Sequence, residues 1–321
     1  MKKPLTLKEY IKGFKDQNIM VLSKAISLVE SSRVEDRELA SELLEKLKPE
    51  KFAKVIGVSG TPGVGKSSFI ETFGNILVDK GQKLAVLAID PSSVRTGGSI
   101  LGDKTRMETL ATRAFIRPSA SGTTLGGVAA KTKESIMLCE AFGFDVILIE
   151  TVGVGQSEVT VSQMVDFFLL LMQPGSGDNL QGIKRGILEV CHMVAVNKAD
   201  GDLINEANIA KSEYEMALRI LRSTDVYKPT VKTCSALKNI GLEDIWTEIK
   251  VYFENAKISE IRNKQNSIWF DQQINDEIQH RIKSSTKFQI EKSQLVKKKV
   301  FHIRDAQKLV DELFAGKFKN D

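Results

Sequence analysis

One short stretch near residue 60 limits the possible folds of this chain more than any other. Gly60-Thr-Pro-Gly-Val-Gly-Lys-Ser67 fits the pattern G-x-x-x-x-G-K-[ST], follows the apolar run Val55–Ser59, and precedes a helical pattern from Ser68 to Val78. Glycines let backbone N–H groups approach phosphate oxygens, and the following helix adds the positive end of its dipole. The sequence therefore predicts a strand–loop–helix unit that binds nucleotide phosphates, rather than a glycine-rich turn with no ligand.

The predicted phosphate site assigns a role to each type of residue in the loop. Lys66 is expected to reach the β- and γ-phosphate oxygens, and the Ser67 hydroxyl is expected to bind Mg²⁺. The residues predicted to line the site are Gly60, Pro62, Gly63, Val64, Gly65, Lys66, Ser67 and Ser68.

Short apolar runs separated by helical stretches dominate the middle of the chain. They are Val55–Ser59, Leu84–Ile89, Val146–Ile149, Phe167–Met172, Met193–Val196 and Val231–Cys234. Such runs are typical of strands buried on both faces, and their alternation with helices predicts an α/β fold with a mostly parallel central sheet. In such a sheet, ligands bind at the carboxyl ends of the strands.

The flanking regions have helical rather than strand patterns. Two amphipathic helices are expected before about Glu50, and the segment after about Val251 has only helical periodicity. We therefore predict an N-terminal helical extension (1–50), a P-loop domain (51–252) and a C-terminal helical extension (253–321). The apolar stripe from Ile258 to Ile282 leaves two alternatives open, packing on the main domain or pairing with a second copy of the chain.

Two carboxylates follow apolar strands and so lie at the predicted ligand edge. Asp90 ends the run Leu84–Ile89, and Glu150 ends Asp145–Ile149. Either could cap a turn, yet both stand where a metal bound to nucleotide phosphates would lie. Gly153 is placed so that its N–H could sense a γ-phosphate.

The base-recognition motif distinguishes guanine from adenine. Asn197-Lys198-Ala-Asp200 follows the strand Met193–Val196, and Ser235-Ala236-Leu237 follows the next strand. The Asp200 carboxylate can accept hydrogen bonds from N1–H and the exocyclic amine of guanine, a donor pair that adenine lacks. An Asn/Asp turn is the alternative, but the position of the motif favours a GTP site and Mg²⁺-dependent GTP hydrolysis.

Bulk properties exclude several other classes. The net charge of +5 is modest for 321 residues, and the three cysteines are too far apart for a CxxC metal pair or a dense disulfide framework. No stretch approaches the ~20 apolar residues of a spanning helix. We expect a cytoplasmic protein that binds neither membrane nor nucleic acid. The basic stretch Lys292 to Arg304 leaves a nucleic-acid or membrane contact as an alternative to a solvated helix face.

Longer matches show that the chain resembles the MeaB/ArgK/MMAA GTPases, chaperones of adenosylcobalamin-dependent methylmalonyl-CoA mutase. The resemblance runs from about Leu22 to Tyr252, with weaker agreement in the C-terminal helices. The matching stretches are Gly57–Ser68, Ala88–Ser93, Thr96–Met107, Ile149–Glu158 and Gly177–Lys184. Several long matches in the same order are much more specific than the phosphate loop alone.

The resemblance implies functional roles that residue patterns alone do not. It implies that Ser67, Asp90, Asp103 and Glu150 gather around Mg²⁺ and the hydrolytic water, with Asp103 on a loop that responds to nucleotide. It also implies that Gly177–Lys184 relays the nucleotide state to the mutase, and that the C-terminal helices form a homodimer. In one place the chain departs from the family, because Gly122 and Thr123 stand where the family usually has Arg-Gly. A charge-based role of that loop is therefore in question.

Two enzymatic alternatives come from related classes. A metallochaperone GTPase for metal insertion would need clustered histidines and cysteines, whereas this chain has three of each. A transport-associated ATPase or kinase would not need the motif Asn197–Asp200. Competition between GTP and ATP separates the second alternative from a GTPase.

Overall fold

The computed structural model describes most of the chain in two compact units. The described residues are 5–31, 33–90, 107–120, 125–151, 157–175, 185–223, 227–297 and 303–314. Unit 1 comprises residues 1–265 and unit 2 comprises residues 266–321. The phosphate loop and the base motif both belong to unit 1.

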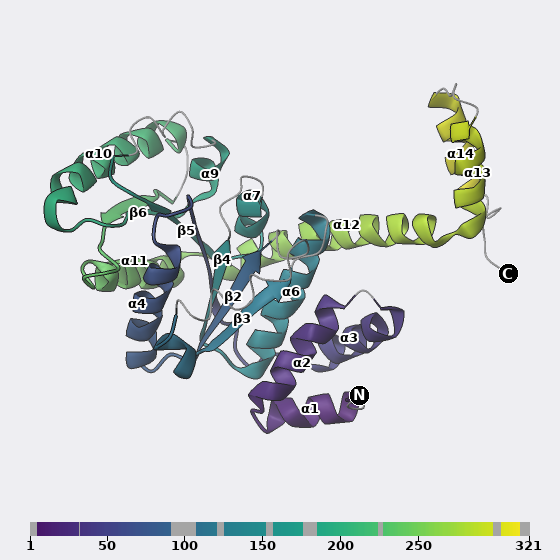
Figure 1. The fold of residues 1–321 in the computed structure, drawn as a ribbon, viewed down its shortest axis with the longest axis horizontal. Coiled ribbons are helices and arrows are strands. Elements are labelled where there is room, and N and C mark those ends of the chain that lie inside the picture. Colours follow the sequence, from purple (N-terminus) through teal and green to yellow (C-terminus); the bar gives the residue numbers. More distant parts are fainter. Residues whose placement is uncertain are drawn as a thin grey trace. The chain divides into compact units, whose positions relative to one another are not determined.

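The described part of unit 1 is built on a seven-stranded sheet with the order β3-β2-β4-β1-β5-β6-β7 (Figure 1). Every pairing between these strands is parallel. The strands are β1 (Lys54–Gly60), β2 (Leu84–Asp90), β3 (Phe115–Ala120), β4 (Val146–Thr151), β5 (Phe167–Met172), β6 (Met193–Val196) and β7 (Thr230–Thr233). The predicted α/β fold with a parallel sheet is confirmed.

Six of these strands coincide with the predicted apolar runs, and β3 was missed. It lies at the edge of the sheet and pairs only with β2 among the described strands. Only its first two residues, Phe115 and Ile116, are large and apolar, and Arg117 and Pro118 follow them. Pro is tolerated in an edge strand, where it need not donate to a neighbour. A short edge strand therefore lacks the continuous apolar pattern of a central one.

Helices cover both faces of the sheet. Successive side chains of a strand point to opposite faces, so the buried residues form two clusters, one on each face. In β5, Phe167 and Leu169 belong to one cluster of buried residues, whereas Phe168 and Leu170 belong to the other. The first cluster lies beneath α4 (Lys66–Asp79) and α11 (Leu242–Asn255). The second lies beneath α6 (Leu125–Phe142) and α10 (Ile204–Leu221). These helix pairs lie on opposite sides of the sheet in Figure 1.

The described N-terminal region contains three helices rather than the two that were predicted. They are α1 (Leu7–Lys15), α2 (Ile19–Glu30) and α3 (Val34–Lys46). The extra helix, α1, begins with a capping box in which Thr6 and Glu9 bond each other's backbone. It packs against α6, where the rings of Phe14 and Phe142 lie 5.6 Å apart in an edge-on arrangement. A nine-residue helix has too few apolar positions to stand out in a sequence.

Short helices and the C-terminal helices complete the described structure. The short ones are α7 (Ser157–Ser162), α9 (Arg185–Val190), η2 (Leu110–Thr112) and η3 (Gly201–Leu203). The helix α12 (Ile258–Ser284) begins in unit 1, and α13 (Thr286–Lys297) and α14 (Ile303–Phe314) belong to unit 2. Phe270, Ile274 and Ile278 are exposed on α12. None of the described helices has the length and hydropathy needed to cross a membrane.

A largely buried histidine between β5 and β6 makes stability depend on pH. The Nδ1 atom of His192 accepts a hydrogen bond from the Phe168 N–H at 3.0 Å, which requires the neutral ring. Burial, helped by nearby Arg222, lowers the His192 pKa from 6.5 to about 4. Between these two values the unfolded chain binds more protons than the folded one. The stability supplied by His192 is therefore present above about pH 6.5 and declines as the pH falls toward 4.

We expect the His192→Gln variant to lose stability less steeply than the wild type over this pH range. Glutamine keeps an acceptor for the Phe168 N–H but does not titrate. Urea unfolding at a series of pH values should show a slope shallower by up to ~1.4 kcal/mol per pH unit, the value for one proton. Equal slopes for the two proteins would contradict the assignment.

Candidate nucleotide-binding site

The phosphate loop joins β1 to α4 with a backbone that only glycine adopts easily. Gly63 and Gly65 have φ angles of 81° and 94°, and Gly65 is the N-cap of α4. A Cβ atom on Gly65 would lie 2.7 Å from Nδ2 of Asn197. The second glycine of the motif is thus required both by its left-handed conformation and by the close approach of the base motif.

The Lys66 side chain extends back toward the start of the phosphate loop, where its ammonium group binds backbone carbonyls. Its Nζ donates to the carbonyl oxygens of Gly60 at 2.8 Å and Thr61 at 3.2 Å. This position at the start of α4 places a cation beside the backbone N–H groups of the loop. The combination suits the oxygens of a nucleotide phosphate.

A hydroxyl and a carboxylate converge beside the loop. Ser67, on the first turn of α4, donates through Oγ to Oε1 of Glu150 at 3.3 Å. Glu150 is buried near the end of β4, and the next residue, Thr151, donates to Ser59 Oγ on β1 at 2.8 Å. This second bond ties the strand of Glu150 to the strand that leads into the phosphate loop. Oxygen donors of this kind fit Mg²⁺.

Three other predicted site residues lie partly or wholly outside the described residues. Asp90 ends β2, which pairs with β4 through Ala88 and Glu150, so the backbone of Asp90 lies at the same edge as Glu150. The side chain of Asp90 lies outside the described part of the structure, as do Asp103 and Gly153. The predicted switch segment Gly177–Lys184 and the Gly122-Thr123 departure also lie outside it.

Asn197 connects the base motif to the phosphate loop. Its side chain is buried at the end of β6, where Nδ2 donates to Val64 O at 2.9 Å and Oδ1 accepts from Ala236 N at 3.0 Å. Burial raises the Cys234 pKa to about 12, so this thiol stays protonated and can donate to the same Oδ1, at 3.8 Å. One amide therefore holds two loops that are far apart in the sequence.

Lys198 forms a second bridge to the phosphate loop. Its φ angle is 62°, which is uncommon for a residue other than glycine. Its Nζ donates to Gly63 O at 2.7 Å and to Gln173 Oε1 at 3.0 Å. The contact with Gln173 was not foreseen, although the position of Gln173 directly after β5 places it at the ligand edge.

The polar end of the base site is formed by two side chains. The Ser235 hydroxyl donates to Oδ2 of Asp200 and accepts from the Lys238 N–H at 3.1 Å. Leu237, which lies between Ser235 and Lys238 in the sequence, is 83% exposed. A carboxylate held by Ser235, with an exposed apolar side chain two residues further along the Ser235 loop, suits the hydrogen-bonding edge and the flat face of a purine. The structure thus brings together residues predicted from two separate motifs.

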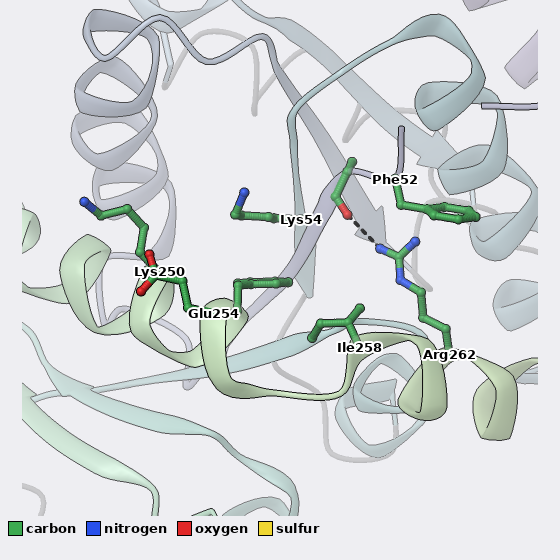
Figure 2. Close-up of a pocket in the computed structure, with 8 residues that line it drawn as sticks. Phe52, Lys54, Lys250, Glu254, Ile258 and Arg262 are labelled. Atoms are coloured by element: carbon green, nitrogen blue, oxygen red, sulfur yellow. Dashed lines mark hydrogen bonds between the residues drawn. The ribbon is translucent and has the colours of Figure 1, made fainter. Parts of the chain in front are cut away.

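A separate pocket of about 360 Å³ lies at the amino-terminal end of β1, away from the phosphate loop (Figure 2). Its lining includes Lys54, the first residue of β1, and Phe253, whose ring lies 5.7 Å from the Lys54 ammonium. The phosphate loop follows the last residue of β1, so this pocket is at the opposite end of the strand. It is not part of the nucleotide site.

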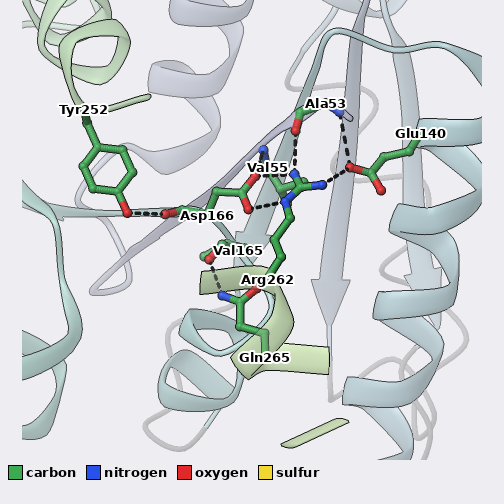
Figure 3. A network of polar contacts seen from close by, with 8 residues as sticks. All are labelled: Ala53, Val55, Glu140, Val165, Asp166, Tyr252, Arg262 and Gln265. Carbon is green, nitrogen blue, oxygen red and sulfur yellow. Dashed lines mark hydrogen bonds and ion pairs between the residues drawn. The ribbon is translucent and has the colours of Figure 1, made fainter. Parts of the chain in front are cut away.

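Arg262 lines this pocket and forms the centre of a buried polar cluster (Figure 3). Its guanidinium donates to Asp166 Oδ1 at 2.7 Å, to Glu140 Oε1 at 2.8 Å and to Ala53 O at 2.7 Å. Asp166 and Glu140 are held further by the N–H groups of Val55 and Ala53, at 3.0 and 3.2 Å. Burial raises the pKa of Glu140, and Arg262 opposes that rise. The cluster joins the first turns of α12 to β1, β5 and α6.

Comparisons with known proteins identify the family of the chain. Residues 22–287 match the family model described as methylmalonyl Co-A mutase-associated GTPase MeaB. The chain is 45% identical to the GTPase ArgK of Escherichia coli over 282 residues, covering 85% of each chain. It is 44% identical to the mouse mitochondrial methylmalonic aciduria type A homolog over 283 residues, covering 82% of this chain and 68% of that one.

A solved structure shares the fold over nearly the whole chain. The crystal structure of an LAO/AO transport system kinase superposes with a TM-score of 0.73 at 34% sequence identity. The match covers 98% of this chain and 99% of that one.

Proposed function

Because the chain belongs to the MeaB family of methylmalonyl-CoA mutase-associated GTPases, it is a GTPase, and we propose that it serves an adenosylcobalamin-dependent acyl-CoA mutase. The observation that carries the site assignment is the bridge through Asn197, which joins Val64 of the phosphate loop to Ala236 of the base loop. A nucleotide bound to both loops would span this bridge. The proposed client is methylmalonyl-CoA mutase.

The proposed reaction is in-line attack of water on the γ-phosphate of GTP. Lys66 and the backbone N–H groups of Gly63 and Gly65 would bind the phosphate oxygens and stabilise the charge that develops on them. The Oγ atom of Ser67 lies 3.3 Å from Oε1 of Glu150, and these two side chains would hold Mg²⁺. Asp90 and Asp103 are the further proposed ligands. When bound, Mg²⁺ supplies positive charge to the β- and γ-phosphate oxygens. Catalysis then depends mainly on positioning and charge neutralisation.

Guanine selectivity would come from the far end of the site. The Asp200 carboxylate, held by the Ser235 hydroxyl, would accept from N1–H and the exocyclic amine of guanine. Lys198 and Leu237 would pack on the two faces of the base. Such selectivity distinguishes this proposal from a transport-associated ATPase or kinase, the kind of activity for which the superposed LAO/AO transport system kinase is named.

We propose that intrinsic turnover is slow and that the client protein stimulates it. The phosphate loop Gly60–Ser67 contains no arginine that could act as a finger. The segments Thr96–Met107, Val152–Glu158 and Gly177–Lys184 are the proposed switches, which would order around the γ-phosphate and release after hydrolysis. This cycle would gate cofactor loading and protect or reactivate the mutase. A homodimer formed by the C-terminal helices is part of the same proposal.

The test is a steady-state measurement of GTP hydrolysis by the purified protein, with ATP as the control. Candidate adenosylcobalamin-dependent mutases from the same organism are added one at a time. We expect ATP to be inert and one mutase to raise the GTPase rate. A GTPase rate that no mutase changes would contradict the chaperone role, and hydrolysis of ATP at a comparable rate would contradict the base-site assignment.

A further inference from the structure

The Thr72 hydroxyl links the helix of the phosphate site to the loop of the base site. Thr72 lies on α4, within two turns of Lys66. Its Oγ1 donates to the carbonyl oxygen of Ala236 at 2.9 Å, across 164 positions of the sequence. The sequence motifs include Ala236 but give no reason to single out Thr72.

The choice of acceptor is informative, because a helical threonine has a local alternative. Threonine in the interior of a helix often donates to the carbonyl four residues earlier. Thr247 does this on α11, where its Oγ1 donates to Glu243 O at 3.0 Å. The Thr72 hydroxyl instead reaches the loop Ser235–Leu237.

Together with Asn197, Thr72 holds Ala236 on both sides. The Ala236 N–H donates to Asn197 Oδ1 at 3.0 Å, and Nδ2 of Asn197 donates to Val64 O at 2.9 Å. The Ala236 carbonyl accepts from Thr72 at 2.9 Å. The bonds form a closed path from the phosphate loop through Asn197, Ala236 and Thr72 to α4, which begins at the same loop. Ala236 itself is buried, so its carbonyl has little access to water as a replacement donor.

We propose that Thr72 is a positioning residue that sets how long a guanine nucleotide stays bound. A nucleotide held by both loops can leave only when one loop withdraws, and the bond from Thr72 resists withdrawal of the base loop. The inference rests on the proposed guanine site. It assigns Thr72 an effect on nucleotide release and not on the hydrolytic step, because its hydroxyl bonds the base loop and not the phosphate loop.

The test measures release of a fluorescent N-methylanthraniloyl GDP after mixing with excess unlabelled GDP. In Thr72→Val the side chain keeps its shape but loses the hydroxyl, and release should become about three- to tenfold faster, the factor for one ordinary hydrogen bond. Thr72→Ser keeps the hydroxyl and should release GDP at nearly the wild-type rate. The single-turnover rate of hydrolysis of prebound GTP should be unchanged in both variants.

Thr247→Val is the matched control, because it removes the same group from a helical threonine outside this path. It should release GDP at the wild-type rate. Wild-type release from Thr72→Val would overturn the inference, as would equal acceleration in Thr72→Ser or in Thr247→Val. A labelled ADP serves as a separate check in the wild type. If ADP binds as well as GDP, the guanine site itself is wrong, whereas a failure confined to Thr72→Val leaves that site standing.

Discussion

Replacing Asp200 with asparagine should transfer the nucleotide preference of this GTPase from GTP to xanthosine triphosphate. Xanthine keeps the N1–H of guanine but has a carbonyl in place of the exocyclic amine. The asparagine Oδ1 can accept from N1–H, and its Nδ2 can donate to the new carbonyl. With guanine, two donors would face each other and a buried polar group would lose its partner.

The expected effect is large because the base site relies on paired polar groups. Sites of this kind reject an analogue with the wrong donors by up to about 10⁴-fold. We expect kcat/KM of Asp200→Asn to fall by up to this factor for GTP and to rise for xanthosine triphosphate, while kcat with the preferred nucleotide stays similar. Both quantities are measured by phosphate release.

Asp202→Asn is the control for this experiment. Asp202 is exposed in η3, two residues further along the chain, and its substitution makes the same change in charge. It should leave the preference for GTP intact. Loss of GTP hydrolysis in Asp200→Asn without any gain for xanthosine triphosphate would mean that Asp200 maintains the loop but does not contact the base.

Replacing Arg262 with methionine should destabilise unit 1 far more than the loss of an exposed ion pair. The substitution removes a guanidinium that is 12% exposed and leaves the carboxylates of Asp166 and Glu140, 2% and 7% exposed, without it. Breaking a buried ion pair by removing one partner costs about 3–5 kcal/mol. The midpoint of urea unfolding, followed by circular dichroism, should fall accordingly.

Arg113→Met provides the comparison for an exposed pair. Arg113 lies 2.6 Å from Asp79, but these side chains are 39% and 64% exposed. Loss of an exposed pair should change the free energy of unfolding by at most about 1 kcal/mol. Neutralising the carboxylates together with Arg262, as in the triple change Arg262→Met, Asp166→Asn and Glu140→Gln, should recover part of the lost stability. Equal losses in Arg262→Met and Arg113→Met would contradict a buried network.

The central sheet and the main site motifs can be recognised in the amino-acid sequence without a structure. Strands such as β5 are buried on both faces, so each residue of Phe167–Met172 must be apolar and the run is visible without a structure. The phosphate loop is equally visible, because its functional residues, such as Gly65 and Lys66, are neighbours in the sequence and form one motif. The base motif could be recognised for the same reason. The roles of Asp103 and Gly153 stay predictions.

The residues that hold these parts together become visible only in the folded chain. Arg262 is one of 46 lysines and arginines, and its partners Asp166 and Glu140 are 96 and 122 positions away. Thr72 meets Ala236 across a comparable separation. The edge strand β3 was also missed, because a strand at the edge of the sheet does not need a continuous run of apolar residues. Local patterns record how a residue fits its own helix or strand, whereas these contacts depend on which elements the fold places side by side.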